Sequence, residues 1–377
     1  MNQREIAELR RRFRPDRANI TAVRGCYFND KGEILSQFTQ SVNLMLEDEK
    51  EKLLGVLKKT LSGTAGKNGV DLSFPTREVL EGEHHKLLTR LRNSRLEDEE
   101  AAQSLFEKIG KSVSFDSNYL ILLAHDAYDV PFRGKDGAAH EEQSDQVFSY
   151  IVCCVCPVKL SKSALSYHTG EGAFHNSKTE WIVAQPEMGF LFPAFDNRST
   201  NLYGAWYYTR DPARENSAFV DTVFGQEPPM TSVQQEENFR SVLGTALEED
   251  CSLAVVQTIH AQLSDMIQEH KDSKEPEALL ISRPEVAHVL KTAGVEQEKV
   301  EAFDKAFDGA FGEDVELRPQ NLMDTRKFRL STPQVAIQVD PAHKDLIETR
   351  VLGGVPYIMI RAEDGVEVNG VPIHIEE

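Results

Sequence analysis

The stretch YLILLAHDAYDVPF (Tyr119–Phe132) begins as an apolar run and then carries a histidine, two aspartates and a proline. Its apolar half is typical of a β-strand. Further strand-like runs follow, separated by clusters of Gly, Asn, Pro and Ser residues, so that the predicted strands cover 118–125, 147–160, 164–168, 180–194 and 201–210. Several strands separated by such turn residues predict an antiparallel sheet.

The segments around this sheet predict helices and a hairpin. Helical spacing is present at residues 2–13, around Leu53–Leu61, and at 76–92 and 97–111. A turn at Asp30-Lys31-Gly32 predicts a hairpin over Thr21–Val42. The larger, N-terminal part of the chain is therefore expected to be an α+β domain.

A boundary is expected near residue 230, where Pro228-Pro229 and a polar run separate the aromatic-rich segments from a mostly helical one. Beyond it, helices are predicted at Leu253–Glu269, from Pro284, and around Val300–Phe307. From about Lys327 the pattern predicts strands arranged as a β-meander. The fold class is therefore α+β, with two domains at 1–230 and 231–377, each with an antiparallel sheet and packed helices.

Composition narrows the class of protein. The 377 residues are 40% hydrophobic and 27% charged, which is enough to form sizeable cores, and the formal net charge is −19. An acidic chain repels phosphate backbones and anionic membranes, so nucleic acid is an unlikely partner and no membrane partner is expected. The N-terminus has no secretory pattern, and the five cysteines form no spaced framework, so we expect a cytoplasmic protein without disulfides.

His125, Asp126 and Asp129 are the candidate catalytic residues. In an extended chain, neighbouring side chains point to opposite faces, so His125 and Asp126 diverge. His125 and Asp129 would share a face but lie about 13 Å apart. The alternative interpretation is a strand that ends here, with its aspartates hydrogen-bonded to a turn.

The stretch GFLFPAFDNRSTNLYGAWYYTRDP, beginning at Gly189, holds seven aromatic residues and several polar ones. Rings that stack a planar ligand and arginines that pair with an anion can form a recognition groove, and the same residues can equally form a sheet core with a polar turn. The candidate binding residues are Asp196, Asn197, Arg198, Trp206, Tyr208 and Arg210.

Cofactor and metal signatures are weak. In a strand, Cys153 points away from Cys154 and Cys156, which favours core cysteines over a zinc site. The Gly66-Lys67 pair lacks the other residues of a phosphate-binding loop. We therefore predict no metal and no cofactor.

Several long sequence strings resemble a bacterial domain family of unknown function that is found chiefly in Gram-positive species. The resemblance spans nearly the whole chain and implies a bacterial cytosolic protein, but it assigns no functional residue. The strings that carry it are REIAELRRRF, RGCYFN, LKKTLSGTAGKN, YLILLAHDAYDVP, FSYIVCCVCPVKL, GFLFPAFDNRSTNLYGAWYYTR, IETRVLGGVPYIMI and VEVNGV.

Three functions are compatible with the sequence. The first is a non-catalytic binding or protein-interaction protein that recognises a protein partner or a small ligand. The alternative is a hydrolase that uses a polar cluster around His125, Asp126 and Asp129, and the third is a nucleic-acid-associated regulator. The sequence leaves the identity of the ligand or partner and the oligomeric state open.

Overall fold

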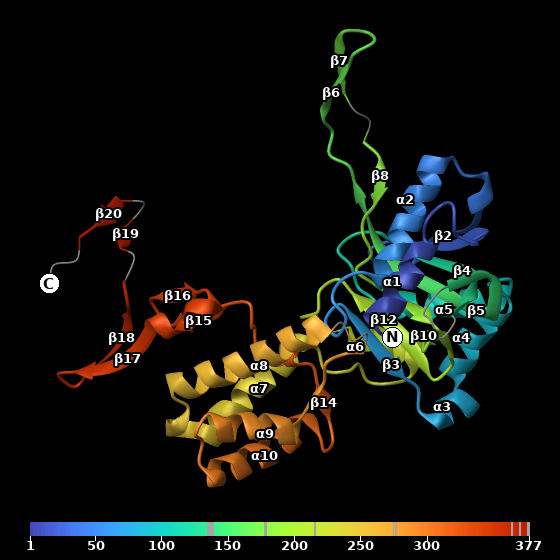
Figure 1. Cartoon of the computed structure of the whole chain (residues 1–377). Helices are drawn as coiled ribbons and strands as arrows, with labels where there is room; N and C mark the ends of the chain where they lie inside the picture. Colours follow the sequence, from blue (N-terminus) through green and yellow to red (C-terminus); the bar gives the residue numbers. More distant parts are fainter. Residues whose placement is uncertain are drawn as a thin grey trace. The chain divides into compact units, whose positions relative to one another are not determined.

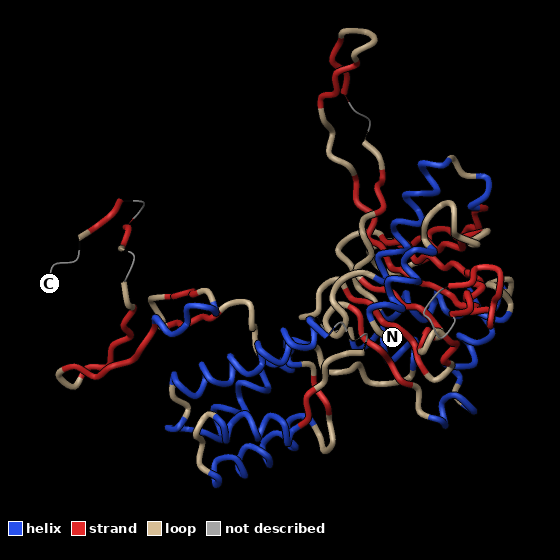
Figure 2. The backbone as a smooth tube through the Cα atoms, viewed as in Figure 1, coloured by secondary structure: helices blue, strands red, loops and turns tan. Residues whose placement is uncertain are grey.

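The computed structural model describes residues 1–133, 139–176, 179–214, 216–273, 275, 277–362, 365–368 and 371–374. Contacts within the chain group it into two compact units, Met1–Thr231 and Ser232–Glu377. Figure 1 labels elements of both units where there is room. Figure 2 shows strands and helices intermixed in the first unit and a group of helices in the second.

The first unit is built on one large antiparallel sheet, which confirms the predicted sheet type. Its strand order is β2-β1-β4-β5-β9-β12-β3, and β8 pairs with β5 outside this path. The strands are β1 (Ala22–Phe28), β2 (Ile34–Ser41), β3 (Gly69–Ser73), β4 (Tyr119–Arg133), β5 (Ala139–Leu160), β8 (Trp181–Val183), β9 (Met188–Phe192) and β12 (Gly204–Thr209).

Helices cover both faces of this sheet, so the first unit has three layers. One core contains side chains from α4 (Glu83–Asn93), α5 (Glu99–Ser112) and α6 (Ser217–Phe224). The other core contains side chains from α1 (Gln3–Arg12) and α2 (Glu47–Lys58). The near-continuous apolar runs of the central strands follow from this double burial.

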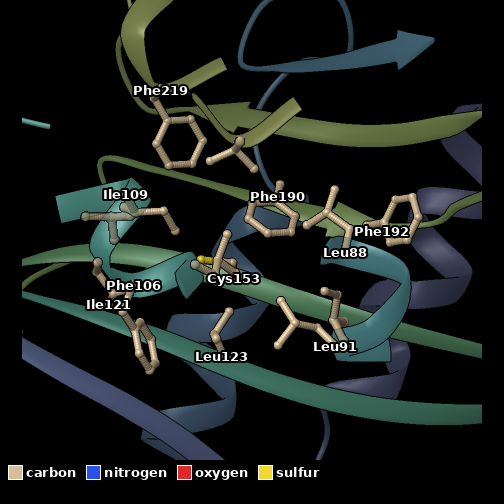
Figure 3. Close-up of a cluster of buried hydrophobic side chains, with 14 of the residues drawn as sticks. Leu88, Leu91, Phe106, Ile109, Ile121, Leu123, Cys153, Phe190, Phe192 and Phe219 are labelled. Atoms are coloured by element: carbon tan, nitrogen blue, oxygen red, sulfur yellow. The ribbon is translucent and has the colours of Figure 1, made fainter. Parts of the chain in front are cut away.

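Figure 3 shows part of the first core, where leucine and phenylalanine side chains from the helices meet strand residues. Cys153 belongs to this core, whereas Cys154 and Cys156 belong to the other. The period-two alternation of a strand therefore places these three cysteines on opposite faces, as the sequence predicted.

The strand that begins at Tyr119 does not end at His125, and the expectation of a turn there is wrong. β4 continues to Arg133 and pairs with β5 throughout, including Asp126 opposite Tyr150. The register shifts only around Pro131. Proline has no N–H to donate to the ladder, so an irregularity at this position is expected.

The strand predicted over 180–194 is interrupted, because β8 and β9 are separate strands with residues 184–187 between them. β8 pairs with the last residues of β5, and the chain between them forms a second pair, β6 (Leu165–His168) with β7 (Ala173–Asn176). Together they form a long, projecting hairpin (Figure 1), here called the arm and defined as residues 158–176 and 179–183.

Smaller elements complete the first unit. A two-residue turn at Asn197 and Arg198, both with positive φ, joins β10 (Ala194–Asp196) to β11 (Ser199–Asn201). The other elements are the 3-10 helices η1 (Val42–Leu44) and η2 (Lys59–Leu61) and the short helix α3 (Thr76–Glu81).

The second unit begins with helices. Those at 253–273, 283–292 and 297–311 were predicted individually from the sequence, whereas the one at 232–247 was expected only as part of a mostly helical segment. These helices enclose a separate apolar core that includes Phe239, Leu263, Leu290 and Phe303. The elements are α7 (Ser232–Leu247), η3 (Glu248–Asp250), α8 (Leu253–Ser273), α9 (Arg283–Thr292), α10 (Gln297–Phe311), α11 (Pro319–Leu322) and the strand pair β13 (Ile281–Ser282) and β14 (Glu316–Leu317).

Beyond α11 the chain forms strands, but not the continuous meander expected from the sequence. Within the described part of this segment, the strands form three separate antiparallel pairs instead. Alternation and turn residues predict strands without specifying which strands pair. The elements are β15 (Phe328–Ser331), β16 (Ala336–Val339), η4 (Pro341–Leu346), β17 (Ile347–Leu352), β18 (Val355–Ile360), β19 (Val366–Val368) and β20 (Val371–Ile373).

The division of the chain predicts that residues 1–231 fold without the remainder. The fragment keeps both sheet cores intact, because every residue of these cores lies before residue 232. We expect a soluble fragment that unfolds cooperatively in a thermal melt followed by circular dichroism. A fragment that melts without a cooperative transition would contradict the predicted domain boundary.

Candidate functional site

A buried carboxylate, Asp126, is the centre of a polar network between α1 and the sheet. Its Oδ2 accepts a hydrogen bond from the Tyr150 hydroxyl at 2.8 Å, and its Oδ1 accepts one from the Asn19 backbone N–H at 3.2 Å. Arg12 of α1 lies 3.4 Å from Oδ2 through its Nε. Asp126 is fully buried and Arg12 is 14% exposed, so the ion pair compensates a charge that water does not reach.

Tyr128 extends this network along β4. The guanidinium of Arg12 lies over its ring, 5.0 Å from the centroid. Its hydroxyl donates to Glu8 Oε1 at 2.7 Å. Burial, and then the hydrogen bond to Glu8, raises the pKa of Tyr128 to about 12, so this hydroxyl stays a donor at neutral pH.

Glu8 also binds Arg198, one of the candidate binding residues. Arg198 Nη2 lies 2.9 Å from Glu8 Oε1, and Arg198 Nε lies 3.2 Å from Glu8 Oε2. Arg198 Nη2 also donates to the Pro131 carbonyl at 3.0 Å, and its backbone N–H donates to Glu5 Oε1 at 3.1 Å. Two nitrogens of the Arg198 guanidinium thus bind the Glu8 carboxylate, so this candidate binding residue makes its ion pair within the chain.

His125 does not join this network. It lies on the other face of β4, where its Nε2 is 2.8 Å from Ser149 Oγ. Burial lowers the pKa of His125, the negative charge of Asp126 opposes that shift, and the positive charges of Arg95 and Arg92 add to it. The divergence of His125 from Asp126 therefore agrees with the expected alternation.

The other polar candidates lie apart from one another. Asp129 is exposed on β4. Asp196 is half-buried at the end of β10 and accepts a hydrogen bond from Asn201 Nδ2 at 3.4 Å. Asn197 occupies the turn with φ 49°, a left-handed conformation that asparagine tolerates better than most residues.

The aromatic candidates are inside the molecule. Trp206 is 2% exposed and donates from Nε1 to the Thr60 carbonyl at 2.8 Å. Tyr208 is also buried, and burial raises its pKa. Arg210 is exposed and pairs with Glu187 at 2.8 Å. A recognition surface in this stretch would therefore consist of its polar turn, Arg210 and Tyr203, which is 46% exposed, without the buried rings.

The cysteine cluster is also part of the cores. Cys154 and Cys156 lie with their sulfurs 3.8 Å apart, and burial raises the pKa of Cys153 well above its ordinary value. A buried thiol with a raised pKa is a poor nucleophile and a poor metal ligand. Across the described ranges, no group of three or more His, Cys, Asp and Glu side chains could hold a metal ion.

The candidate catalytic and binding residues do not converge on one position. Asp126 and Arg198 contact the same helix, but through different residues of it, while His125 lies behind the sheet and Asp129 faces solvent. A hydrolase needs its acid, base and nucleophile around one substrate position. The geometry of these candidates gives the hydrolase hypothesis no support.

The arm is the candidate binding surface that the sequence did not reveal. Its outer part has two different faces. Tyr167 pairs with Phe174 and Leu165 with Asn176 on one face, whereas Ser166 pairs with His175 on the other. Leu165 is 69% exposed and Phe174 68%, and the Tyr167 and Phe174 rings lie 5.2 Å apart. The arm therefore presents an exposed apolar face.

The base of the arm, where β5 pairs with β8, is also apolar. Leu160 and Trp181 pair across it, and both are more than half exposed. They line an open depression of about 440 Å³ together with Phe115, whose ring lies 5.8 Å from the Arg214 guanidinium carbon. A signal for the arm was present in the sequence, because Leu165 and Tyr167 alternate before the turn residues Gly170 and Gly172.

The chain matches the model of a protein family described as a domain of unknown function (DUF4317) over residues 1–371. The match covers nearly the whole chain, so the chain belongs to this family, and the resemblance found in the sequence is confirmed. No curated protein and no solved structure matches the chain. Among the helices of the described residues, none is both long enough and apolar enough to cross a membrane.

The Asp126 network predicts a large difference between two aspartates of one strand. Asp126→Ala leaves Arg12 and the Tyr150 hydroxyl without their partner, and we expect it to destabilise the first unit by about 3–5 kcal/mol. Asp129→Ala, at an exposed position, is expected to change stability by less than about 0.5 kcal/mol. Urea unfolding followed by tryptophan fluorescence measures both, since the two tryptophans, Trp181 and Trp206, lie in this unit.

Equal losses for the two aspartate variants would show that the network does not hold α1 on the sheet.

His125 predicts a pH dependence of stability. Its pKa is lowered in the folded protein, so below about pH 6.5 the unfolded chain binds a proton that the folded chain does not yet bind. Stability is therefore lost as the pH falls from about 6.5 towards the lowered pKa. We expect His125→Gln to lose less stability than the unmodified protein between about pH 7 and pH 5. Urea unfolding at both pH values checks this, and an unchanged loss would contradict it.

Proposed function

We propose that this protein is a non-catalytic binding protein that engages a protein partner through the apolar face of the arm. The observation that carries this proposal is the exposure of Leu165, Tyr167 and Phe174 on one face of a two-stranded hairpin. Large apolar side chains gathered on one exposed face are typical of interaction surfaces.

Stability supports the same proposal. A two-stranded hairpin alone is marginally stable in water, because it needs further strands or a helix to cover its apolar side. Among the described residues, β6 pairs only with β7. A partner surface that covers Tyr167 and Phe174 would supply the missing burial, at roughly 25 cal/mol for each Å² of apolar area removed from water.

The chemistry of the arm indicates the kind of partner. The apolar face carries two aromatic rings and a leucine, while the pair between His175 and Glu171, at 2.9 Å, is exposed. The arm therefore fits a groove of a protein partner that is apolar at its centre and polar at its rim. Nucleic acid is a poor match, because the chain carries a net charge of −19.

We also propose that the protein acts in the bacterial cytoplasm. Cys251 is exposed and free, and the buried cysteines are also free thiols. Free thiols are typical of proteins in a reducing compartment. The bacterial origin follows from the resemblance of the sequence to a family found chiefly in Gram-positive species.

The test compares two neighbouring positions of β7. A photo-crosslinking phenylalanine analogue replaces Phe174 on the apolar face or His175 on the opposite face, and the full chain is irradiated in its native cells. We expect a discrete adduct from position 174 and at least about tenfold less adduct from position 175. The reason is that only the side chain at position 174 lies on the apolar face that the partner is proposed to contact. Similar yields at both positions, or no adduct at position 174, would contradict the proposal.

A further inference from the structure

The outer strand of the large sheet, β2, has an unusual composition for an exposed edge. Its sequence, ILSQFTQS, has no charged residue, no proline and no glycine, although 27% of the chain is charged. Among the described residues, β1 is its only strand neighbour. Exposed edges are normally protected by charges, prolines or bulges, because their free N–H and C=O groups pair readily with another strand.

The side chains of β2 are exposed as well. Leu35 is 52% exposed and Phe38 38%. Phe38 lies over Gly25 of β1, where a Cβ atom would overlap its ring, so the strand is held closely against the sheet. Leu44, at the end of the 3-10 helix η1 that follows the strand, is 88% exposed and extends the uncharged surface.

The ladder shows which backbone groups face the open side. The Val42 N–H donates to the Thr21 carbonyl at 2.8 Å, so these two residues form a hydrogen-bonded pair. Hydrogen-bonded and non-hydrogen-bonded pairs alternate along an antiparallel ladder. Counting back from Val42, the residues Gln40 and Phe38 point their amides at β1, and Thr39 and Gln37 point theirs outward.

We propose that β2 pairs with β2 of a second copy of this chain, antiparallel and centred on Phe38, so that the two sheets join into one. This proposal goes beyond the proposed function, since it concerns a different surface from the arm.

The register follows from the direction of the amides. Residues whose amides point outward can form hydrogen-bonded pairs only with residues whose amides also point outward, and these are every second residue. A two-fold axis between identical strands must therefore pass beside a residue that is paired with the same residue of the other copy. Centring on Phe38 pairs Gln37 with Thr39 and Ser36 with Gln40. Centring on Gln37 would instead pair Thr39 with Leu35, which has no partner on β1 because the register shifts there.

A second copy fits this edge because the strand is compatible with itself in charge. Each chain carries a net charge of −19, so two copies repel each other except where the facing surfaces carry no charge. β2 is such a surface, and a two-fold axis places its uncharged face against itself. The pairs that form are of types compatible with a sheet, since glutamine, serine and threonine side chains hydrogen-bond across strands.

The first experiment is sedimentation velocity of the purified full chain over a range of concentrations. We expect a monomer–dimer equilibrium that Thr39→Pro weakens by about tenfold or more, because the outward N–H of each copy is lost. Thr39→Val keeps that N–H and is the matched control, expected to dimerise as the unmodified chain does. Circular dichroism confirms that each variant is folded.

Arm variants separate this proposal from the proposed function. Phe174→Ser, on the arm, is expected to leave the dimer unchanged. A chain that stays monomeric at all concentrations, a dimer unaffected by Thr39→Pro, or a dimer lost with Phe174→Ser would overturn the β2 dimer.

The second experiment tests the register without depending on the proline variant. In a Cys251→Ser background, Phe38→Cys places two thiols opposite each other in a non-hydrogen-bonded pair, with Cα atoms about 4.5 Å apart, within disulfide range. Ser36→Cys places its two thiols about 13 Å apart, because residue 36 faces residue 40. Mild oxidation should link the first variant and not the second, and equal linkage or none would overturn the register.

Discussion

The central strands of the large sheet are buried on both faces, and the rest of the first unit depends on this constraint. Alternate residues of β4 and β5 enter different cores, with Cys153 on one side and Cys154 on the other. Helices must therefore cover both faces, which is what α4, α5 and α6 do on one side and α1 and α2 on the other. A strand with two apolar faces is stable only in such a layered arrangement.

The same constraint explains the contacts that the buried polar residue of β4 makes. A charge on a strand that is covered from both sides must find its partners within the protein. Asp126 finds them in Arg12 and the Tyr150 hydroxyl, and Arg198 finds Glu8 on the same helix. These polar contacts fix the position of α1 on the sheet, so Asp126, one of the three catalytic candidates, and Arg198, a binding candidate, join the two layers.

Local patterns in the sequence predicted most of the elements, because the spacing of apolar residues depends on the element itself. The divergence of His125 from Asp126 was predictable for this reason. The length of a strand could not be predicted in the same way, because it depends on the partner strand. β4 continues past His125 because β5 continues beside it. The arm was missed because Leu165 and Tyr167 alternate as they would in a buried strand, and only the fold shows that nothing described covers them.

The sheet leaves two kinds of surface uncovered, and they call for different kinds of contact. In the arm, the backbones of the pairs β5–β8 and β6–β7 are hydrogen-bonded to each other while the apolar face is exposed, so the contact that the arm lacks is a side-chain surface. β2 has its inner amides paired and its outer amides free, so its missing contact is an extended strand. The arm lacks a side-chain contact and β2 lacks a backbone contact, so one partner segment does not satisfy both. A second copy paired with β2 would therefore leave the arm of each copy available to a different protein.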